Sequence, residues 1–284
     1  MPSTRMKSIA LYAAALILAL GVLLYAAYKH FAPGQDQGVT QAWNTSNESS
    51  DGSISHEEWQ VVLDDYLIAD DPSGITLFDY QGLIDDGGHG LDAYLESLAS
   101  IDPRDYNRAE QFAYWVNLYN ALTVKVVVES YPVESIKQIG ESTIPPGPWN
   151  DPVVLIAGEE LTLNHIEHSI LRPIWQDFRI HFAVNCASIG CPNLQPQAFT
   201  ADNTEALLEQ ATFDYLGHSR GLAIEEGQVW LSSIFSWYQE DFGNNESELI
   251  ELISDYLPDG DAAKLGDHSG GIEYRYDWRL NDYQ

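Results

Sequence analysis

The chain is poor in basic residues, and this scarcity limits which partners it can bind. It has 13 Lys and Arg against 43 Asp and Glu, which gives a formal net charge of −30 at pH 7. Such a surface repels the phosphate backbone of nucleic acids and anionic lipids. We therefore expect no nucleic-acid binding. The acidity is typical of solubility in a salty medium, where salt screens the self-repulsion.

Acidic residues are absent before Asp36, and residues 8–28 carry no charge of either sign. A helix needs about 20 apolar residues to cross a bilayer. The run is longer than the apolar core of a signal peptide, about 7–15 residues, and Tyr25 and Tyr28 do not suit a cleavage site. We expect an uncleaved single-pass anchor in the cell inner membrane, with a cleaved signal as the alternative.

The basic residues near this run predict its orientation. Arg5 and Lys7 precede it, and flanks rich in Lys and Arg stay in the cytoplasm. The body of the protein should then lie on the periplasmic or extracytoplasmic side. The expected organisation is a cytoplasmic end at 1–7, a transmembrane anchor at 8–28, a polar linker at 29–53 and an exported domain at 54–284.

Residues 47–58, NESSDGSISHEE, imitate the 12-residue calcium loop of an EF-hand. The loop needs an entering helix, which the preceding QAWNTS does not predict, and Ser49 is a poor ligand. The other interpretation is a linker that ends in a helix N-cap at Ser55, with Glu58 completing the capping box. Weak calcium binding stays an open alternative, and no cofactor is implied.

The hydrophobic pattern predicts helices and strands that are interspersed without regular βαβ alternation. The run at 108–130 is apolar nearly all round, so it should be the central buried helix. The fold class expected is α+β, with helices packed on a mainly antiparallel sheet. Further helices are expected at 56–70, 90–102, 164–175, 201–219 and 247–258. Strands or hairpins are expected at 74–80, 153–163, 179–185, 221–233 and 271–281.

Two polar groups interrupt apolar helical patterns. Asn117 and Asn120 are three residues apart and share a face of the central helix. Buried amides need hydrogen-bond partners, so the pair either holds a neighbouring loop or polarises a substrate carbonyl. His165, His168 and Arg172 share a face of the next helix. A His and Cys zinc site would need further ligands at metal spacing, so we expect no metal.

The stretch RIHFAVNCASIGCPNL contains the only two cysteines, Cys186 and Cys191. If residues 179–186 form one strand, Cys186 lies on its apolar face and His181 on the other. A base for Cys186 would then come from another element, such as His168. The sulfurs could form a disulfide, which an exported domain would keep, or Cys186 could be a nucleophile, or both could be packing residues.

Together, FAYWVNLYNALTVK, LTLNHIEHSILR, RIHFAVNCASIGCPNL and YRYDWRLN resemble the DUF547 family, a domain of unknown function. The resemblance covers about 54–281 and implies an exported or membrane-anchored bacterial protein without an established activity. The polar positions that it carries over are Asn117, Asn120, Glu167, His168, Arg172, His181, Cys186, Ser188 and Cys191. A looser likeness to papain- and transglutaminase-like proteins is kept as an alternative. There the nucleophile starts the central helix, whereas the helix here has no cysteine.

Two functions from different classes follow. The first is a thiol-dependent hydrolase or acyl transferase with Cys186 as nucleophile and His168 as base. Asn117 or Asn120 would polarise the carbonyl. The residues expected to bind substrate are Arg172, His181, Asn185 and Ser188, with Arg172 holding a carboxylate. The rival is a non-catalytic binding or scaffold module with a Cys186–Cys191 disulfide. Its ligand, a small molecule or a protein, is open, and so is whether the protein is an enzyme.

Overall fold

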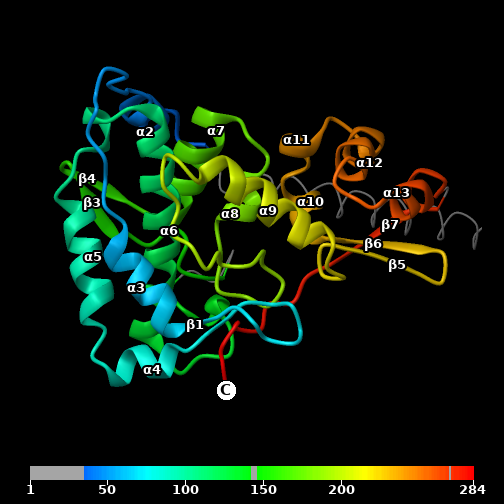
Figure 1. Cartoon of the computed structure of the whole chain (residues 1–284), viewed down its shortest axis with the longest axis horizontal. Helices are drawn as coiled ribbons and strands as arrows, with labels where there is room; N and C mark the ends of the chain where they lie inside the picture. The colour runs from blue at the N-terminus through cyan, green and yellow to red at the C-terminus, as the bar shows by residue number, and fades with distance from the viewer. Residues whose placement is uncertain (1–34, 142–145, 269) are drawn as a thin grey trace, which may run out of the picture.

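The centre of the protein is one long buried helix. The computed structural model describes residues 35–141, 146–268 and 270–284 (Figure 1). Helix α6, Arg108–Ser130, has every residue from 111 to 124 buried, which confirms the central helix predicted from the sequence. It begins where the side chain of Asn107 accepts from the N–H groups of Ala109 and Glu110, as an N-cap residue does. All other parts of the larger core pack around it.

Short helices surround α6. Helix α3, Glu57–Tyr66, packs on α5, His89–Ala99, and α5 packs on α6. The other helices near α6 are α4 at Tyr80–Asp85, η1 at Pro103–Asp105, η2 at Ile136–Gln138 and α9 at Thr204–Leu216. The hydrophobic pattern predicted helices here with one buried face. The structure agrees, since Trp59 and Val62 of α3 and Leu91 of α5 are each about 1% exposed.

The polar stretch expected as a linker contains a helix. Residues Gln37–Trp43 form α2, and Trp43 is 1% exposed. Its ring meets Trp115 of α6 edge-on, with centroids 5.1 Å apart. This part of the stretch at 29–53 therefore contributes a large side chain to the main core.

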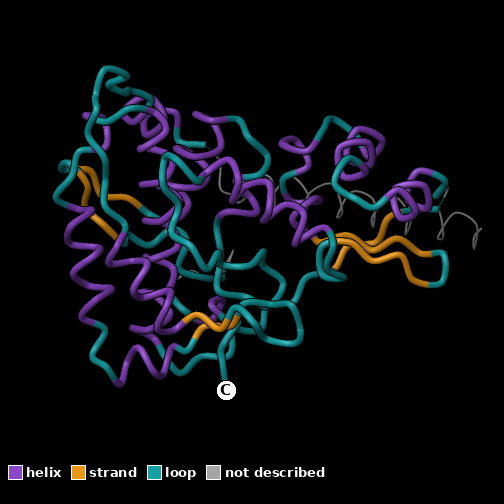
Figure 2. Tube along the Cα trace, viewed as in Figure 1, coloured by secondary structure: helices purple, strands orange, loops and turns teal. Residues whose placement is uncertain are grey.

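The strands form three small sheets instead of one main antiparallel sheet, so that part of the fold prediction is wrong (Figure 2). Strands β1, Leu67–Ile68, and β2, Leu77–Phe78, are antiparallel. Strands β3, Val154–Ile156, and β4, Glu159–Leu161, form the expected hairpin. The largest sheet joins β5, Leu222–Glu225, β6, Gln228–Ser232, and β7, Ile272–Arg275, with β6 and β7 parallel.

The strand expected at 179–185 is mostly a helix. Residues Ile180–Ala183 form α8, and the chain becomes extended only at Val184. A short apolar run buried on all sides fits a helix as well as a strand, because periodicity cannot separate them. A strand at 179–185 would also need a neighbouring strand to pair with, whereas α8 packs against helix α9.

A second core lies beside the largest sheet. Besides α8 and α9, the helices that contribute residues to it in the described part of the chain are α10 at Ser233–Trp237, α11 at Gln239–Phe242, α12 at Glu246–Ser254 and α13 at Asp259–Gly266. Phe182 of α8 packs in this core, with Phe235 and Phe242 as neighbours. The two cores therefore meet near α8, and Figure 1 shows α12 and α13 at the far end from α3 and α5.

The predicted single-pass anchor needs correction. No helix within 35–141, 146–268 and 270–284 is long and apolar enough to span a bilayer. The longest, α6, has 23 residues but carries Arg108, Glu110, Lys125 and Glu129, and protein side chains cover it. Within these residues the structure therefore does not bear out the predicted transmembrane helix, signal anchor or inner-membrane, periplasmic placement. The run at 8–28, on which these predictions rested, lies outside the described residues.

Replacing Trp43 by Ala tests whether α2 belongs to the core. The variant should lose about 3–5 kcal/mol of unfolding free energy, because a buried Trp leaves a large cavity. Leu155→Ala is the control, since Leu155 is 56% exposed and should change stability by under about 0.5 kcal/mol. Urea unfolding followed by fluorescence measures both. Equal effects of the two substitutions would contradict the packing of α2.

Candidate functional site

The site is a loop that carries both cysteines, and α6 fixes its start. Asn120 of α6 is 2% exposed, and its side chain binds the backbone on both of its polar ends. Its Nδ2 donates to the carbonyl of Ala183 at 3.0 Å, and the N–H of Asn185 donates to its Oδ1 at 2.8 Å. Because a buried amide must be satisfied, this arrangement fixes the chain just before Cys186.

Asn117 makes the same kind of contact one turn earlier on α6. Its Nδ2 donates to the carbonyl of Phe199 at 2.7 Å, and the N–H of Phe199 donates to its Oδ1 at 3.0 Å. The structure therefore uses both amides of the predicted carbonyl-polarising pair to hold neighbouring chain segments. Their amide groups bind backbone and not the sulfurs.

Asn185 closes the cysteine loop. Its Nδ2 donates to the carbonyl of Pro192 at 2.7 Å, and its Oδ1 accepts from the N–H of Ala187 at 2.8 Å. Ala187 has a φ of 57°, a left-handed conformation that is uncommon for a residue with a side chain. The side chain of Asn185 thus holds the backbone at Ala187 and Pro192 and fixes the loop between them.

The C-terminal segment lies against this loop. The N–H groups of Ile189 and Gly190 donate to the carbonyls of Arg279 and Asp277, each at 2.8 Å. A Cβ on Gly190 would lie 2.8 Å from the backbone nitrogen of Asp277, so glycine allows this close approach. The contact brings Tyr276 to the sulfurs, 90 residues away from Cys186 along the chain.

Four side chains meet at the loop. The Sγ of Cys186 lies 2.9 Å from the Sγ of Cys191, 3.1 Å from the hydroxyl of Tyr276 and 3.2 Å from the hydroxyl of Ser188. The hydroxyls of Ser188 and Tyr276 are 3.0 Å apart. Both cysteines are free. Cys186 is partly exposed, whereas Cys191 is 4% exposed, so Cys186 is the more accessible of the two residues.

These contacts make the two thiols different. The hydrogen bond from Cys191 lowers the pKa of Cys186, with smaller contributions from Ser188 and Tyr276, and together they outweigh burial. Burial raises the pKa of Cys191 well above its ordinary value, and so does the neighbouring Cys186. Burial likewise raises the pKa of Tyr276, so its hydroxyl stays protonated and can donate. The arrangement favours a thiolate at Cys186 beside a protonated thiol at Cys191.

The predicted residues of the next helix form a second, charged cluster. Residues His165–Leu171 form a π-helix, η3, which continues into α7, Arg172–Trp175. Arg172 is 8% exposed, and its Nε donates to Oδ2 of Asp241 at 2.6 Å. A second donor reaches Oε1 of Glu240 at 3.2 Å. The guanidinium expected to hold a substrate carboxylate is thus engaged by two carboxylates of the protein.

His168 and His181 also belong to this charged cluster. Nδ1 of His168 lies 3.1 Å from Nη1 of Arg172, and it must accept because a guanidinium only donates. Burial lowers the pKa of His168 to about 4, so the ring is neutral. His181 Nε2 lies 2.6 Å from Oδ2 of Asp241, and its ring stacks on Tyr238 at 4.4 Å between centroids. Although burial opposes it, bonding to His181 and Arg172 lowers the pKa of Asp241 to about 2.

Glu167 connects the two clusters. Its Oε2 accepts from the hydroxyl of Tyr119 at 2.9 Å, and its charge is close enough to Cys186 to raise the pKa of that thiol slightly. Within the described part of the chain, no hydrogen bond joins Cys186 to a histidine ring. The expected pairing of Cys186 with His168 is therefore absent from this arrangement.

Residues 103–216 match the family model described as "Protein of unknown function, DUF547". The match confirms the resemblance to the DUF547 family over this segment. The match is shorter than the resemblance predicted for 54–281, but it contains α6, η3, α8 and the cysteine loop. No curated protein and no solved structure matches the chain.

The DUF547 segment does not contain every residue of the site. Tyr276 lies beyond it, in the stretch YRYDWRLN, and its sequence gave no sign of contact with Cys186. Asp241 also lies outside the segment and had no motif around it. Aromatic rings continue from Tyr276, since Trp278 lies 4.7 Å and Trp237 4.8 Å from it between centroids. All three rings are partly exposed, so the side of the site near Cys186 is apolar and aromatic.

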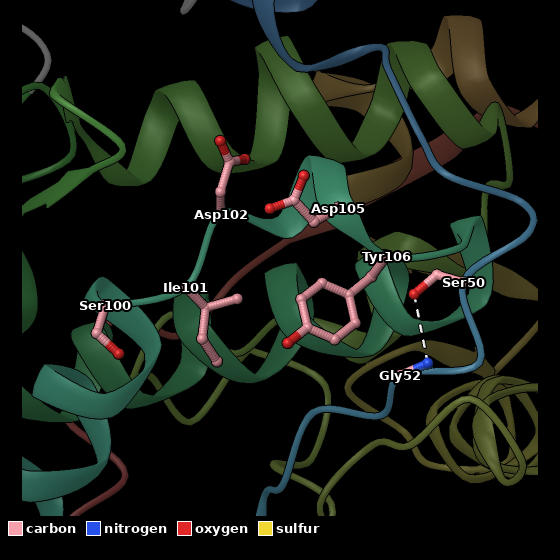
Figure 3. A pocket seen from close by; sticks show the side chains of 7 residues that line it. All are labelled: Ser50, Gly52, Ser100, Ile101, Asp102, Asp105 and Tyr106. Atoms are coloured by element: carbon pink, nitrogen blue, oxygen red, sulfur yellow. Dashed lines mark hydrogen bonds between the residues drawn. The ribbon is translucent and has the colours of Figure 1, made fainter.

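A pocket of about 400 Å³ lies apart from the predicted residues (Figure 3). Its lining consists of Ser50, Gly52, Ser100, Ile101, Asp102, Asp105 and Tyr106. Part of the lining is the calcium-like loop, in which the hydroxyl of Ser49 donates to Oδ1 of Asn47 at 2.7 Å. Asp102 is paired with Arg104. Among the described residues, no three His, Cys, Asp or Glu side chains are placed to hold a metal.

Tyr276→Phe tests the hydrogen bonding at Cys186. Loss of one donor to a thiolate should slow alkylation of Cys186 by iodoacetamide at pH 7 about tenfold, since such a bond contributes about 1.5–3 kcal/mol. Tyr66→Phe is the matched control, because the Tyr66 hydroxyl binds Asp86 and not a sulfur. Intact-mass kinetics on the native protein measures the rates. An unchanged rate in Tyr276→Phe would refute the contact.

Protonation of His168 should destabilise the fold at low pH. The unfolded ring takes up a proton below its ordinary pKa of 6.5, whereas the folded ring does so only near 4. The contribution to stability is thus lost as pH falls from 6.5 toward 4, roughly 2 kcal/mol between pH 7 and 5. Urea unfolding at both pH values measures this loss of unfolding free energy. The loss should be smaller in His168→Gln than in the wild type, and it should be unchanged in His89→Gln, because His89 is exposed.

Proposed function

We propose that the protein is a thiol-dependent hydrolase or acyl transferase with Cys186 as its nucleophile. The observation that carries the proposal is that Cys186 is partly exposed and that its Sγ lies 2.9–3.2 Å from one thiol and two hydroxyls, each of which can donate to it. A thiolate is the reactive form of cysteine, and hydrogen bonds to it favour that form. A preformed thiolate needs no histidine in contact to remove its proton, so the base role given to His168 is not required.

The reaction then uses the residues around the sulfur. The thiolate attacks the carbonyl carbon of an ester, thioester or amide, and a carbon–sulfur bond forms. The bond to the leaving group breaks as that group takes a proton from the paired hydroxyls of Ser188 and Tyr276, which are 3.0 Å apart. Water or a second acceptor then attacks the acyl thioester and returns its proton to the deprotonated hydroxyl, and the carbon–sulfur bond breaks to free Cys186 as the thiolate. The half-exposed rings of Trp237 and Trp278 favour acyl groups with an apolar or aromatic part.

The charged cluster supports the site without joining the reaction. Asp241 binds both Arg172 and His181, which join η3–α7 to α8, the helix that leads into the cysteine loop. Buried charges are stable when they are paired and hydrogen-bonded. In this proposal Arg172 and His181 are positioning residues for α8.

The second candidate function is a non-catalytic binding module, and the short distance between the sulfurs favours it. With Sγ atoms 2.9 Å apart, Cys186 and Cys191 are close enough to be joined as a structural staple. In a stapled protein neither sulfur would react until it was reduced, whereas the enzyme needs Cys186 reduced and available.

Acylation of Cys186 by p-nitrophenyl acetate separates these functions. The reduced native protein should gain one acetyl group on Cys186 at least tenfold faster at pH 7 than the urea-unfolded protein does, because only the folded loop stabilises the thiolate. Cys186→Ser should abolish this adduct. Peptide mapping by mass spectrometry locates it, and the unfolded wild type controls for ordinary thiol reactivity. A native rate no higher than the unfolded rate would rule out the enzyme.

A further inference from the structure

The acyl-transfer proposal gives the sulfur of Cys191 no role in the reaction. A nucleophile needs a donor beside it, and a hydroxyl such as Ser188 already supplies one. Cys191 nevertheless lies 2.9 Å from the nucleophilic sulfur, and it also accepts from the N–H of Cys186 at 2.9 Å. The pair is held at both ends by Asn185, through Ala187 and Pro192.

We infer that Cys186 and Cys191 form a redox-active dithiol that carries out thiol–disulfide exchange on small or peptide disulfides. Cys186 is the attacking sulfur and Cys191 the resolving one. The inference rests on the proposed nucleophile Cys186 and adds a second class of substrate to the same site.

Exposure gives the two sulfurs these roles. Cys186 is partly exposed and reaches a substrate disulfide, whereas Cys191 is 4% exposed and reaches only Cys186. A buried resolving thiol cannot be captured by a second substrate molecule, so a mixed disulfide at Cys186 has one fast exit. The sulfurs need to approach by under about 1 Å to reach the length of a disulfide bond.

The exchange balances in two steps. In the first, the Cys186 thiolate attacks one sulfur of RS–SR, a Cys186–SR bond forms, and the first RS⁻ leaves as a thiolate. In the second, the sulfur of Cys191 attacks the sulfur of Cys186, the Cys186–SR bond breaks, and the proton of the Cys191 thiol passes to the departing second RS⁻, which leaves as RSH. The N–H of Cys186 stabilises the Cys191 thiolate that forms in this step. The dithiol supplies two electrons, the substrate becomes two thiols, and an external thiol reductant restores the pair.

Surrounding groups protect the second step from water. Tyr119 and Tyr215 are each about 1% exposed, and the hydroxyl of Tyr215 donates to the carbonyl of Gly190 at 2.8 Å, next to Cys191. Because these side chains keep water away, Cys191 holds its proton until Cys186 carries the substrate thiol. Cys191 then attacks the mixed disulfide and does not react with the substrate itself. The two thiols are not both ionised, because a negative charge on one sulfur raises the pKa of the other.

The test counts thiols released by the full-length reduced protein on reaction with 5,5′-dithiobis(2-nitrobenzoate). The wild type should release two equivalents of the coloured thiolate, lose two hydrogens and retain no adduct. Cys191→Ser should release one equivalent and keep a stable mixed disulfide on Cys186. Cys186→Ser should react at least tenfold more slowly. Circular dichroism shows whether each variant is folded, and intact mass on the wild type alone gives the decisive count.

The outcomes separate this inference from the acyl-transfer proposal. If the wild type reacts fast but keeps one adduct on Cys186, the redox inference is wrong and the nucleophile stands. If native Cys186 reacts no faster than the unfolded thiol, the nucleophile fails and the redox role fails with it. Repeating the reaction with glutathione disulfide must give the same intramolecular disulfide, and failure to form it would also overturn the inference.

Discussion

One buried amide holds the candidate site in place. Asn120 sits on the central helix, where every neighbouring residue is apolar or buried, and its two polar ends can be satisfied only by the backbone at Ala183 and Asn185. An unpaired amide there would cost about 1–3 kcal/mol, so the chain entering the cysteine loop has one favourable position. The side chain of Asn185 also binds backbone, since it donates to the carbonyl of Pro192 and so closes the loop. The rigid helix thus sets the place of two sulfurs that lie on a loop.

Sulfur and charge are kept apart in this protein, and the separation explains the chemistry that it favours. The charged cluster neutralises itself, since Asp241 is shared by Arg172 and His181 and His168 stays neutral. From this side of the site Glu167 acts on Cys186, and its negative charge raises the pKa of that thiol. Neutral groups, namely Cys191, Ser188 and Tyr276, lower the pKa of Cys186 instead, and the side of the site next to them is aromatic. The thiolate that we propose would need no charge on a carbonyl or disulfide substrate, because the groups bound to the sulfur are uncharged.

Sequence reasoning succeeded where one physical rule was decisive. Helix α6 was predictable because its 23 residues contain no Pro or Gly and are apolar nearly all round. It failed at 179–185, where a short apolar run suits either a helix or a strand. The π-helix at His165–Leu171 was not predicted, although His168 and Arg172 still lie in contact, as their shared face implied. Tyr276 and Asp241 reach the site from 90 and 60 residues away, and no local pattern marks such contacts.

The account depends most on Cys186 being a thiolate near neutral pH, and thiolate absorbance at 240 nm measures this directly. The difference between the reduced wild type and Cys186→Ser, followed from pH 4 to 10 on the folded proteins, isolates this one sulfur. We predict a midpoint clearly below the free-cysteine pKa of about 8.5, with no second thiolate appearing until much higher pH. A midpoint at or above that value would show that the three donors do not stabilise the thiolate, and the site would then be a packing feature.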